Sequence, residues 1–276
     1  MLLLLVVIVS FSGEDAVTRE WGQLKNVPDN SNVPIPLPAS GVYGHGKKGN
    51  DKTHVDKALF TFSWQKGKAL LNYYIAGVGK GEVDIVLNDH KIGSAPAFNG
   101  WLNVKNVRLP EEYLRKGENR LVFDNVINPP GSLPGPGGSE TWGVSDVNVK
   151  IEDYPACDQA LAEENYNRAV MKYKEKKISY RNLYDAVENY RKAVDYFMVC
   201  DPRPPMFDES RKGLMTTEQE LDSEYEARML AAQQAANSQD WDRVKREMED
   251  VLKIIPDPDD YRYVKADSNL VSLGLK

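Results

Sequence analysis

The sequence is poor in the residues on which many catalytic sites depend. Its 276 residues include only two Cys and three His. It has no Gly-x-Ser-x-Gly motif, no nucleotide-binding fingerprint and no Cys-His pair with a supporting residue. The carboxylates are numerous, but none form the framed pair that cleavage of a glycosidic bond requires. We therefore expect a protein that is not an enzyme and that uses no cofactor.

Metal and nucleic-acid binding also find little support. His45 and His54 share one loop, where Asp51 or Asp56 could complete a metal site with His90. No His-x-His spacing frames such a site, so we expect no metal. The chain has a net charge of -6 and a pI near 5.3, and it contains no long basic run with interleaved aromatic residues. Such a chain repels phosphate backbones, which excludes nucleic acid as an expected partner.

The first 13 residues, MLLLLVVIVSFSG, are almost entirely apolar. A complete membrane-spanning helix needs about 20 apolar residues, so this segment is too short. It is either the outer end of a membrane helix in a longer chain or the remnant of a secretory signal, although a signal would normally begin with basic residues. A buried strand is the third interpretation. The first two agree that the rest of the chain lies outside the cytoplasm, in the periplasm or at the cell surface, and we expect the apolar segment to hold it at the membrane.

Composition divides the rest of the chain into three parts. Residues 14–40 are rich in Pro and Asn and predict an extended spacer. Residues 41–154 contain the strand signals, and residues 155–276 contain the helical ones. The predicted fold class is therefore multidomain β + α, with an antiparallel β-sandwich followed by an all-α domain of helical hairpins.

Alternation of apolar and polar residues with period two recurs from residue 58 to residue 151. Short segments bounded by Gly, Asn or Pro predict the strands: ALFTFSW, GEVDIVLN, KIG, WLNVKNVRL, NRLVFDNV and WGVSDVNVKI, together with ALLNYYIAG. The last of these is a near-continuous apolar run, which suits a strand buried on both faces. Seven or eight short antiparallel strands of this kind predict two packed sheets.

The stretches VDIVLNDHKIG, WLNVKNVRLP, EEYLRKGENRLVFDN and WGVSDVNV resemble the galactose-binding-like jelly roll, an accessory domain of glycosidases and cell-surface proteins. The resemblance covers about residues 55–152 and rests on motifs of shape. Gly117 supplies backbone freedom at a corner, Glu118 and Asn119 can bond nearby backbone groups, and Leu121 and Phe123 are expected in the core.

A carbohydrate site is the remaining ligand hypothesis. Trp101, Trp142, Asn99 and His90 lie near predicted strand ends, and an exposed indole beside amide and imidazole groups can bind a sugar ring. The alternative is that both Trp side chains fill the core. The loop NPPGSLPGPGGSE, residues 128–140, has few functional groups and is expected to be a spacer or partner-contact loop.

The last part of the chain shows helical periodicity in four segments, residues 156–177, 182–200, 216–239 and 240–258. Small and aromatic residues alternate in a way that resembles tetratricopeptide repeats, over about residues 156–270. DPRPPMFDESRKG, residues 201–213, is interpreted as a linker between two repeats. Two repeats are fewer than the roughly three that a free-standing solenoid needs, so the helices should lean on the sandwich or on a partner chain. Tyr166, Tyr173, Tyr190 and Trp241 are the candidate partner-binding face.

Cys157 begins the first predicted helix and Cys200 ends the second. These ends are neighbours in an antiparallel hairpin, so the sequence predicts a disulfide between them and an oxidising compartment. Two buried free thiols are the alternative.

These expectations combine into one functional hypothesis: a membrane-tethered, extracytoplasmic scaffolding subunit of a bacterial cell-envelope assembly. Its partners would be other protein subunits or copies of itself. The alternative is a carbohydrate-binding adaptor whose sandwich attaches to peptidoglycan or to a surface glycan.

Overall fold

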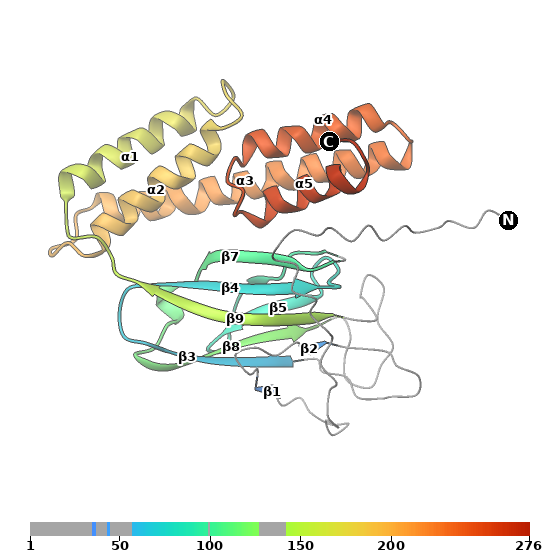
Figure 1. Cartoon of the computed structure of the whole chain (residues 1–276). Coiled ribbons are helices and arrows are strands. Elements are labelled where there is room, and N and C mark those ends of the chain that lie inside the picture. The colour runs from blue at the N-terminus through green and yellow to red at the C-terminus, as the bar shows by residue number, and fades with distance from the viewer. Residues whose placement is uncertain (1–34, 37–42, 45–56, 99, 127–141) are drawn as a thin grey trace.

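The computed structural model describes residues 35–36, 43–44, 57–98, 100–126 and 142–276 of the chain. A β-sandwich comes first and five helices follow it, lying along one side of the sandwich (Figure 1). This arrangement confirms the predicted β + α fold class. The apolar N-terminal segment, most of the spacer, the Pro-Gly loop and Asn99 lie outside the described residues.

Two sheets make up the sandwich, and all seven predicted segments are strands. The first sheet has the order β1(Ile35–Pro36), β3(Lys57–Trp64), β8(Gly117–Asn125), β5(Val83–Leu87) and β6(His90–Ser94). The second has the order β2(Tyr43–Gly44), β9(Gly143–Glu152), β4(Lys68–Ala76) and β7(Leu102–Arg108). Neighbouring strands are antiparallel, except that β1 runs parallel to β3.

The alternation seen in the sequence places apolar side chains between the sheets. Leu71, Tyr73 and Ile75 of β4 point inward, where the Tyr73 ring meets the Phe123 ring of β8 edge-on with centroids 5.1 Å apart. Leu121 and Phe123 have no exposed surface, which confirms their predicted core positions. Edge-on aromatic contact adds to the burial of both rings, so this pair helps to join the two sheets.

The corner before β8 is built from backbone conformation and buried amides. After the short helix η1(Glu111–Tyr113), Gly117 adopts a φ of +95°, which only Gly accepts without strain. The Asn119 side chain accepts a hydrogen bond from the Arg115 N–H at 2.8 Å and donates to the Arg115 carbonyl at 2.7 Å. Asn119 therefore has the predicted architectural role, whereas Glu118 is exposed to solvent.

Five helices follow: α1(Gln159–Lys174), α2(Asn182–Met198), α3(Met206–Asn237), α4(Trp241–Ile254) and α5(Tyr261–Ser272). A disulfide joins Cys157, just before α1, to Cys200, just after α2, with Cα atoms 4.9 Å apart. The predicted pairing is thus confirmed. No helix among the described residues is both long and apolar enough to cross a bilayer.

The predicted linker at residues 201–213 is wrong over most of its length, because α3 begins at Met206 and continues for 32 residues. The cluster Pro202, Pro204 and Pro205 ends before the helix, and Pro205 is its N-cap, a place where a missing N–H costs nothing. Gly213 lies inside the helix. Tetratricopeptide repeats consist of helix pairs of similar length, whereas α3 is about twice as long as its neighbours. The predicted repeats are therefore not confirmed.

The helices contact the sandwich, which was one of the two predicted supports for them; the other was a partner chain. Asp195 of α2 pairs with Lys68 of β4 at 3.1 Å and with Arg108 of β7 at 2.6 Å. Tyr261 and Val264 of α5 pack against the sandwich core. Charged contacts and apolar contacts both cross this boundary, which we call the seam, so both α2 and α5 are attached to the sandwich.

Candidate functional site

Two of the predicted sugar-binding residues lie at one end of the sandwich. Ile75 pairs with Leu102 and Ala76 pairs with Gly143, so Trp101 and Trp142 flank the end of β4 on its two sides. Trp142 is fully buried and belongs to the core, whereas Trp101 is half-buried. An indole inside the core cannot stack on a sugar ring, so Trp101 is the sole candidate platform of the two.

His90 lies at the opposite end of the sandwich. It starts β6 and pairs with Leu87, where β5 ends, while β5 begins near the end that carries Trp101. The exposed imidazole stacks on the ring of Tyr113, with centroids 4.3 Å apart and planes 9° apart. The structure therefore does not bring His90 and the two Trp residues together into one site.

Three residues of the predicted partner-binding face pack inside the helical domain. Tyr190 is buried, and its ring meets Tyr166 edge-on with centroids 6.0 Å apart. The hydroxyls of Tyr166 and Tyr173 donate to Glu209 and Glu220 of α3, at 3.0 Å and 2.9 Å. These tyrosines fasten the α1–α2 hairpin to α3.

Trp241, the fourth residue of the predicted face, is 45% exposed at the start of α4. It does not belong to the tyrosine cluster. A large exposed indole is a typical anchor in protein interfaces, so Trp241 remains a candidate contact residue.

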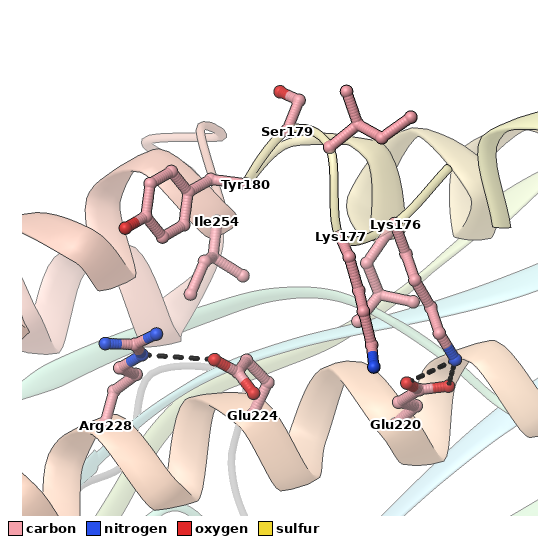
Figure 2. Close-up of a pocket in the computed structure, with 10 residues that line it drawn as sticks. Lys176, Lys177, Ser179, Tyr180, Glu220, Glu224, Arg228 and Ile254 are labelled. Atoms are coloured by element: carbon pink, nitrogen blue, oxygen red, sulfur yellow. Dashed lines mark hydrogen bonds and ion pairs between the residues drawn. The ribbon is translucent and has the colours of Figure 1, made fainter. Parts of the chain in front are cut away.

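A pocket of about 430 Å³ opens between the α1–α2 turn, the middle of α3 and the end of α4. Figure 2 shows Lys176 and Lys177 descending side by side from the turn toward α3, with Tyr180 on the other side of the opening. The lining combines charged and apolar side chains: Lys176, Lys177, Ile178, Ser179, Tyr180, Leu183, Glu220, Glu224, Arg228 and Ile254.

Ion pairs hold the charged lining in place. The Lys176 ammonium lies 2.5 Å from a Glu220 carboxylate oxygen and 4.0 Å from the centre of the Tyr173 ring. Arg228 pairs with Glu224 at 3.1 Å, and also with Glu247 at 3.0 Å. The two ion pairs with α3 residues are drawn as dashed lines in Figure 2. They fix the floor of the pocket.

These pairs favour the ionised forms. Burial disfavours both charges, yet their mutual contact raises the pKa of Lys176 and lowers the pKa of Glu220. A general acid or base works best with a pKa near the ambient pH, whereas both pKa values here move away from neutrality. Lys176 and Glu220 are therefore suited to fixing charge, not to transferring protons.

The lining residues were not among those predicted from the sequence. A signal for them is present in KYKEKKISYR, where basic residues surround an Ile and a Tyr between two helical segments. The sequence around the acidic and basic residues of α3 does not indicate that they line a pocket. They lie near the turn only because of how the α1–α2 hairpin packs on α3. Among the described residues, no group of three or more His, Cys, Asp or Glu side chains could hold a metal ion.

Comparison with known proteins gives little support for a family. No family model and no curated protein matches the chain. Among solved structures, a family 35 carbohydrate-binding module from an environmental isolate is similar at 18% sequence identity. The match covers 36% of this chain and 72% of that chain, with a TM-score of 0.18. A TM-score this low carries no argument about a ligand, and the β-sandwich assignment rests on the strand pairing above.

Proposed function

We propose that this chain is a non-catalytic scaffolding subunit that acts through protein contacts in a bacterial cell-envelope assembly. The observation that carries the proposal is the seam, where Asp195 bridges two strands and Tyr261 packs on the sandwich core. We infer that charged and apolar contacts at the seam restrict the motion of the helices relative to the sandwich. That rigidity is what a scaffold requires of a subunit.

Trp241 is the side chain that we propose as a protein contact. It is large and 45% exposed, and a few Trp, Tyr and Arg residues usually supply most of the binding free energy of an interface. The partner is another subunit or a second copy of the chain. A photo-reactive amino acid at position 241, expressed in the native cell, should give a discrete cross-linked product.

A matched position shows whether that product is specific. Ser63 is exposed on β3, in the sheet remote from the helices, and should give no cross-link when replaced in the same way. Absence of a product at position 241, in a chain that is folded and monomeric in the cell, would refute the contact. Saturable binding of the full chain to peptidoglycan or to an array of glycans, weakened by Trp101→Ala and not by Trp241→Ala, would instead favour the carbohydrate-binding alternative.

We also propose that the chain works outside the cytoplasm, tethered through its apolar residues 1–13. The disulfide supports this location, because structural disulfides persist in oxidising compartments and are rare in the cytosol. Intact cells would be quenched with acid, and free thiols would then be alkylated. Neither Cys157 nor Cys200 should react unless a reductant is added first, and alkylation of both without reductant would contradict the location.

A further inference from the structure

The turn between α1 and α2 exposes apolar side chains to an unusual degree. Ile178 is 80% exposed, more than any other large apolar side chain among the described residues, and Tyr180 is 49% exposed. We call residues 172–181 the hairpin tip. In Figure 1 this turn projects from the helical layer on the side away from the sheets. A single exposed apolar side chain is common on protein surfaces, but here Ile178 and Tyr180 are exposed together on one projecting turn, where both are accessible to another surface.

The hairpin tip is basic within an acidic chain. Residues 172–181 contain five Lys or Arg residues and one Glu, while the whole chain has a net charge of -6. Some of this charge is neutralised, since Lys176 pairs with Glu220 and Arg181 with Asp185 at 2.9 Å. Lys174 and Lys177 are exposed and form no ion pair with another described residue.

Neighbouring helices add charge of both signs. Lys172 lies 3.7 Å from Asp185, and Lys253 of α4 lies 5.6 Å from the Tyr180 ring while pairing with Asp250. Glu224 is held by Arg228. Asp185, Asp250 and Glu224 are thus engaged by bases, whereas Glu175 forms no ion pair with another described residue. Lys174 and Lys177 outnumber Glu175, so the hairpin tip keeps an excess of positive charge.

The size of the apolar surface distinguishes between two classes of partner. A specific protein interface buries on the order of 1,000 Å² or more, with a continuous apolar centre. Ile178 and Tyr180 are two side chains on a convex turn, which is too little for such a centre. A lipid surface needs less, because a few apolar side chains enter the headgroup region while lysines contact lipid phosphates.

We propose that the hairpin tip docks on the surface of an anionic lipid bilayer. Ile178 and Tyr180 enter the interfacial region, and Lys174 lies against lipid phosphates. Lys177, which extends toward α3 in the free chain, is exposed and turns outward to join it on docking. The tyrosine ring suits this boundary because its body is apolar and its hydroxyl remains hydrated. The ion pair of Lys176 with Glu220 of α3 keeps the turn in shape. This contact is separate from the N-terminal tether and does not depend on the scaffolding function.

The test places an environment-sensitive dye within the hairpin tip. Ser179→Cys in the full oxidised chain, labelled at the new thiol, leaves both Ile178 and Tyr180 in place. Vesicles of phosphatidylglycerol and phosphatidylcholine should shift the dye emission to the blue, and vesicles of phosphatidylcholine alone should not. A label at Ser63→Cys, on the remote sheet, should report no shift with either kind of vesicle, even where the apolar N-terminal segment binds both.

Charge and apolar variants in the Ser179→Cys background complete the test. Each neutralised lysine should weaken the lipid-dependent shift about fivefold in apparent affinity, so Lys174→Gln with Lys177→Gln should weaken it about 25-fold. Lys66→Gln with Lys116→Gln removes the same charge from exposed sandwich positions and should have little effect. Ile178→Ser should reduce the blue shift, and 0.5 M salt should reduce the binding.

Three results would overturn the proposal. The first is unchanged emission at position 179 when the chain is bound to anionic vesicles. The second is an equal shift at position 63, which would mean adsorption without orientation. The third is a shift produced by lipid-free envelope protein but not by vesicles, which would assign the hairpin tip to a protein partner.

Discussion

At the scale of single residues, two buried asparagines organise the corner that leads into β8. The Asn119 carbonyl oxygen accepts from the Asn88 side chain at 2.7 Å, and its amide nitrogen donates to the Gly117 carbonyl at 3.0 Å. Asn88 in turn donates to the Tyr113 carbonyl at 2.7 Å. Buried groups of this kind act together, because the loss of one leaves the others without partners.

We predict that Asn119→Ala lowers the free energy of unfolding by about 2–4 kcal/mol, since the buried Asn88 amide and several partly buried backbone groups would lose hydrogen bonds. Glu118→Ala, at the exposed neighbouring position, should change it by less than about 0.5 kcal/mol. Urea titration followed by circular dichroism measures both values. Equal stability of the two variants would show that the amide network contributes nothing.

At the scale of elements, Gly213 explains how α3 packs against α2. A Cβ atom at this position would lie 2.6 Å from the Cε1 and Cζ atoms of Tyr190. The Tyr190 ring is buried against Tyr166 and has little room to move. Gly213 therefore leaves room for the Tyr190 ring to lie close to the α3 backbone. Without that ring, Ala would be favoured at this helical position by about 1 kcal/mol.

Gly213→Ala should therefore destabilise the protein by about 1–3 kcal/mol, despite the higher helix propensity of Ala, because the added methyl overlaps the ring. Replacing Tyr190 by Leu in the same chain should recover part of the loss. Lys212→Ala, at the exposed preceding position, serves as the control. Thermal unfolding of the four chains decides the matter, and a stabilised Gly213→Ala protein would rule out the steric explanation.

The elements also show how far sequence patterns reach. Period-two alternation identified most strands from β3 to β9 because these bury one set of side chains, as Val83, Ile85 and Leu87 do in β5. β4 was predicted from a near-continuous apolar run that suits burial on both faces, yet its side chains alternate between buried and half-buried along most of the strand. The start of α3 was missed because three prolines and Gly213 are usual in loops, and the ring that makes the Gly useful comes from another helix. α5 was not recognised as a separate helix, since part of its apolar surface faces the sandwich through Tyr261 and Val264.

The candidate site was less predictable than the fold. Trp101 and His90 are near strand ends in the sequence, but strand order places them at opposite ends of the sandwich. The pocket joins residues from three helical segments, including Lys176 and Glu220, which are 44 residues apart. Spacing along the chain does not predict contacts between distant helices such as this one. The two Cys could be paired correctly because an antiparallel hairpin brings its two ends together.

At the scale of the whole molecule, the disulfide closes a loop between residues separated by 43 positions. The chain-entropy model assigns about 3–4 kcal/mol to a loop of this length. We expect Cys157→Ala with Cys200→Ala to lower the free energy of unfolding by that amount or somewhat less. Reductant should lower the stability of the natural chain to a similar degree and leave the double variant unchanged. A natural chain insensitive to reductant, with its thiols shown to be reduced, would contradict this.

Alkaline pH should weaken the seam through its tyrosines. Burial, reinforced by the nearby carboxylates of Asp222 and Asp260, raises the pKa of Tyr261 to about 12, although Arg262 opposes this. Burial also raises the pKa of Tyr154 to about 12 against the effect of Arg108, and Glu111, which accepts the Tyr154 hydroxyl at 2.8 Å, reinforces the rise. An unfolded tyrosine ionises near pH 10. The folded state therefore retains protons that the unfolded state has lost, so stability present below pH 10 declines as the pH rises to about 12.

Each of the two tyrosines can contribute at most about 1.4 kcal/mol per pH unit to that decline, and less where its hydroxyl retains contact with water. Tyr154→Phe with Tyr261→Phe keeps both rings but removes both ionisations, so its stability should fall less steeply from pH 10 to pH 12. Burial raises the pKa of Tyr184 and Tyr225 as well, and these should leave a residual slope. Tyr180→Phe, at an exposed side chain, should follow the natural chain. Urea unfolding at pH 8, 10 and 11 gives the slopes, and equal slopes for the double variant and the natural chain would exclude these tyrosines as the cause.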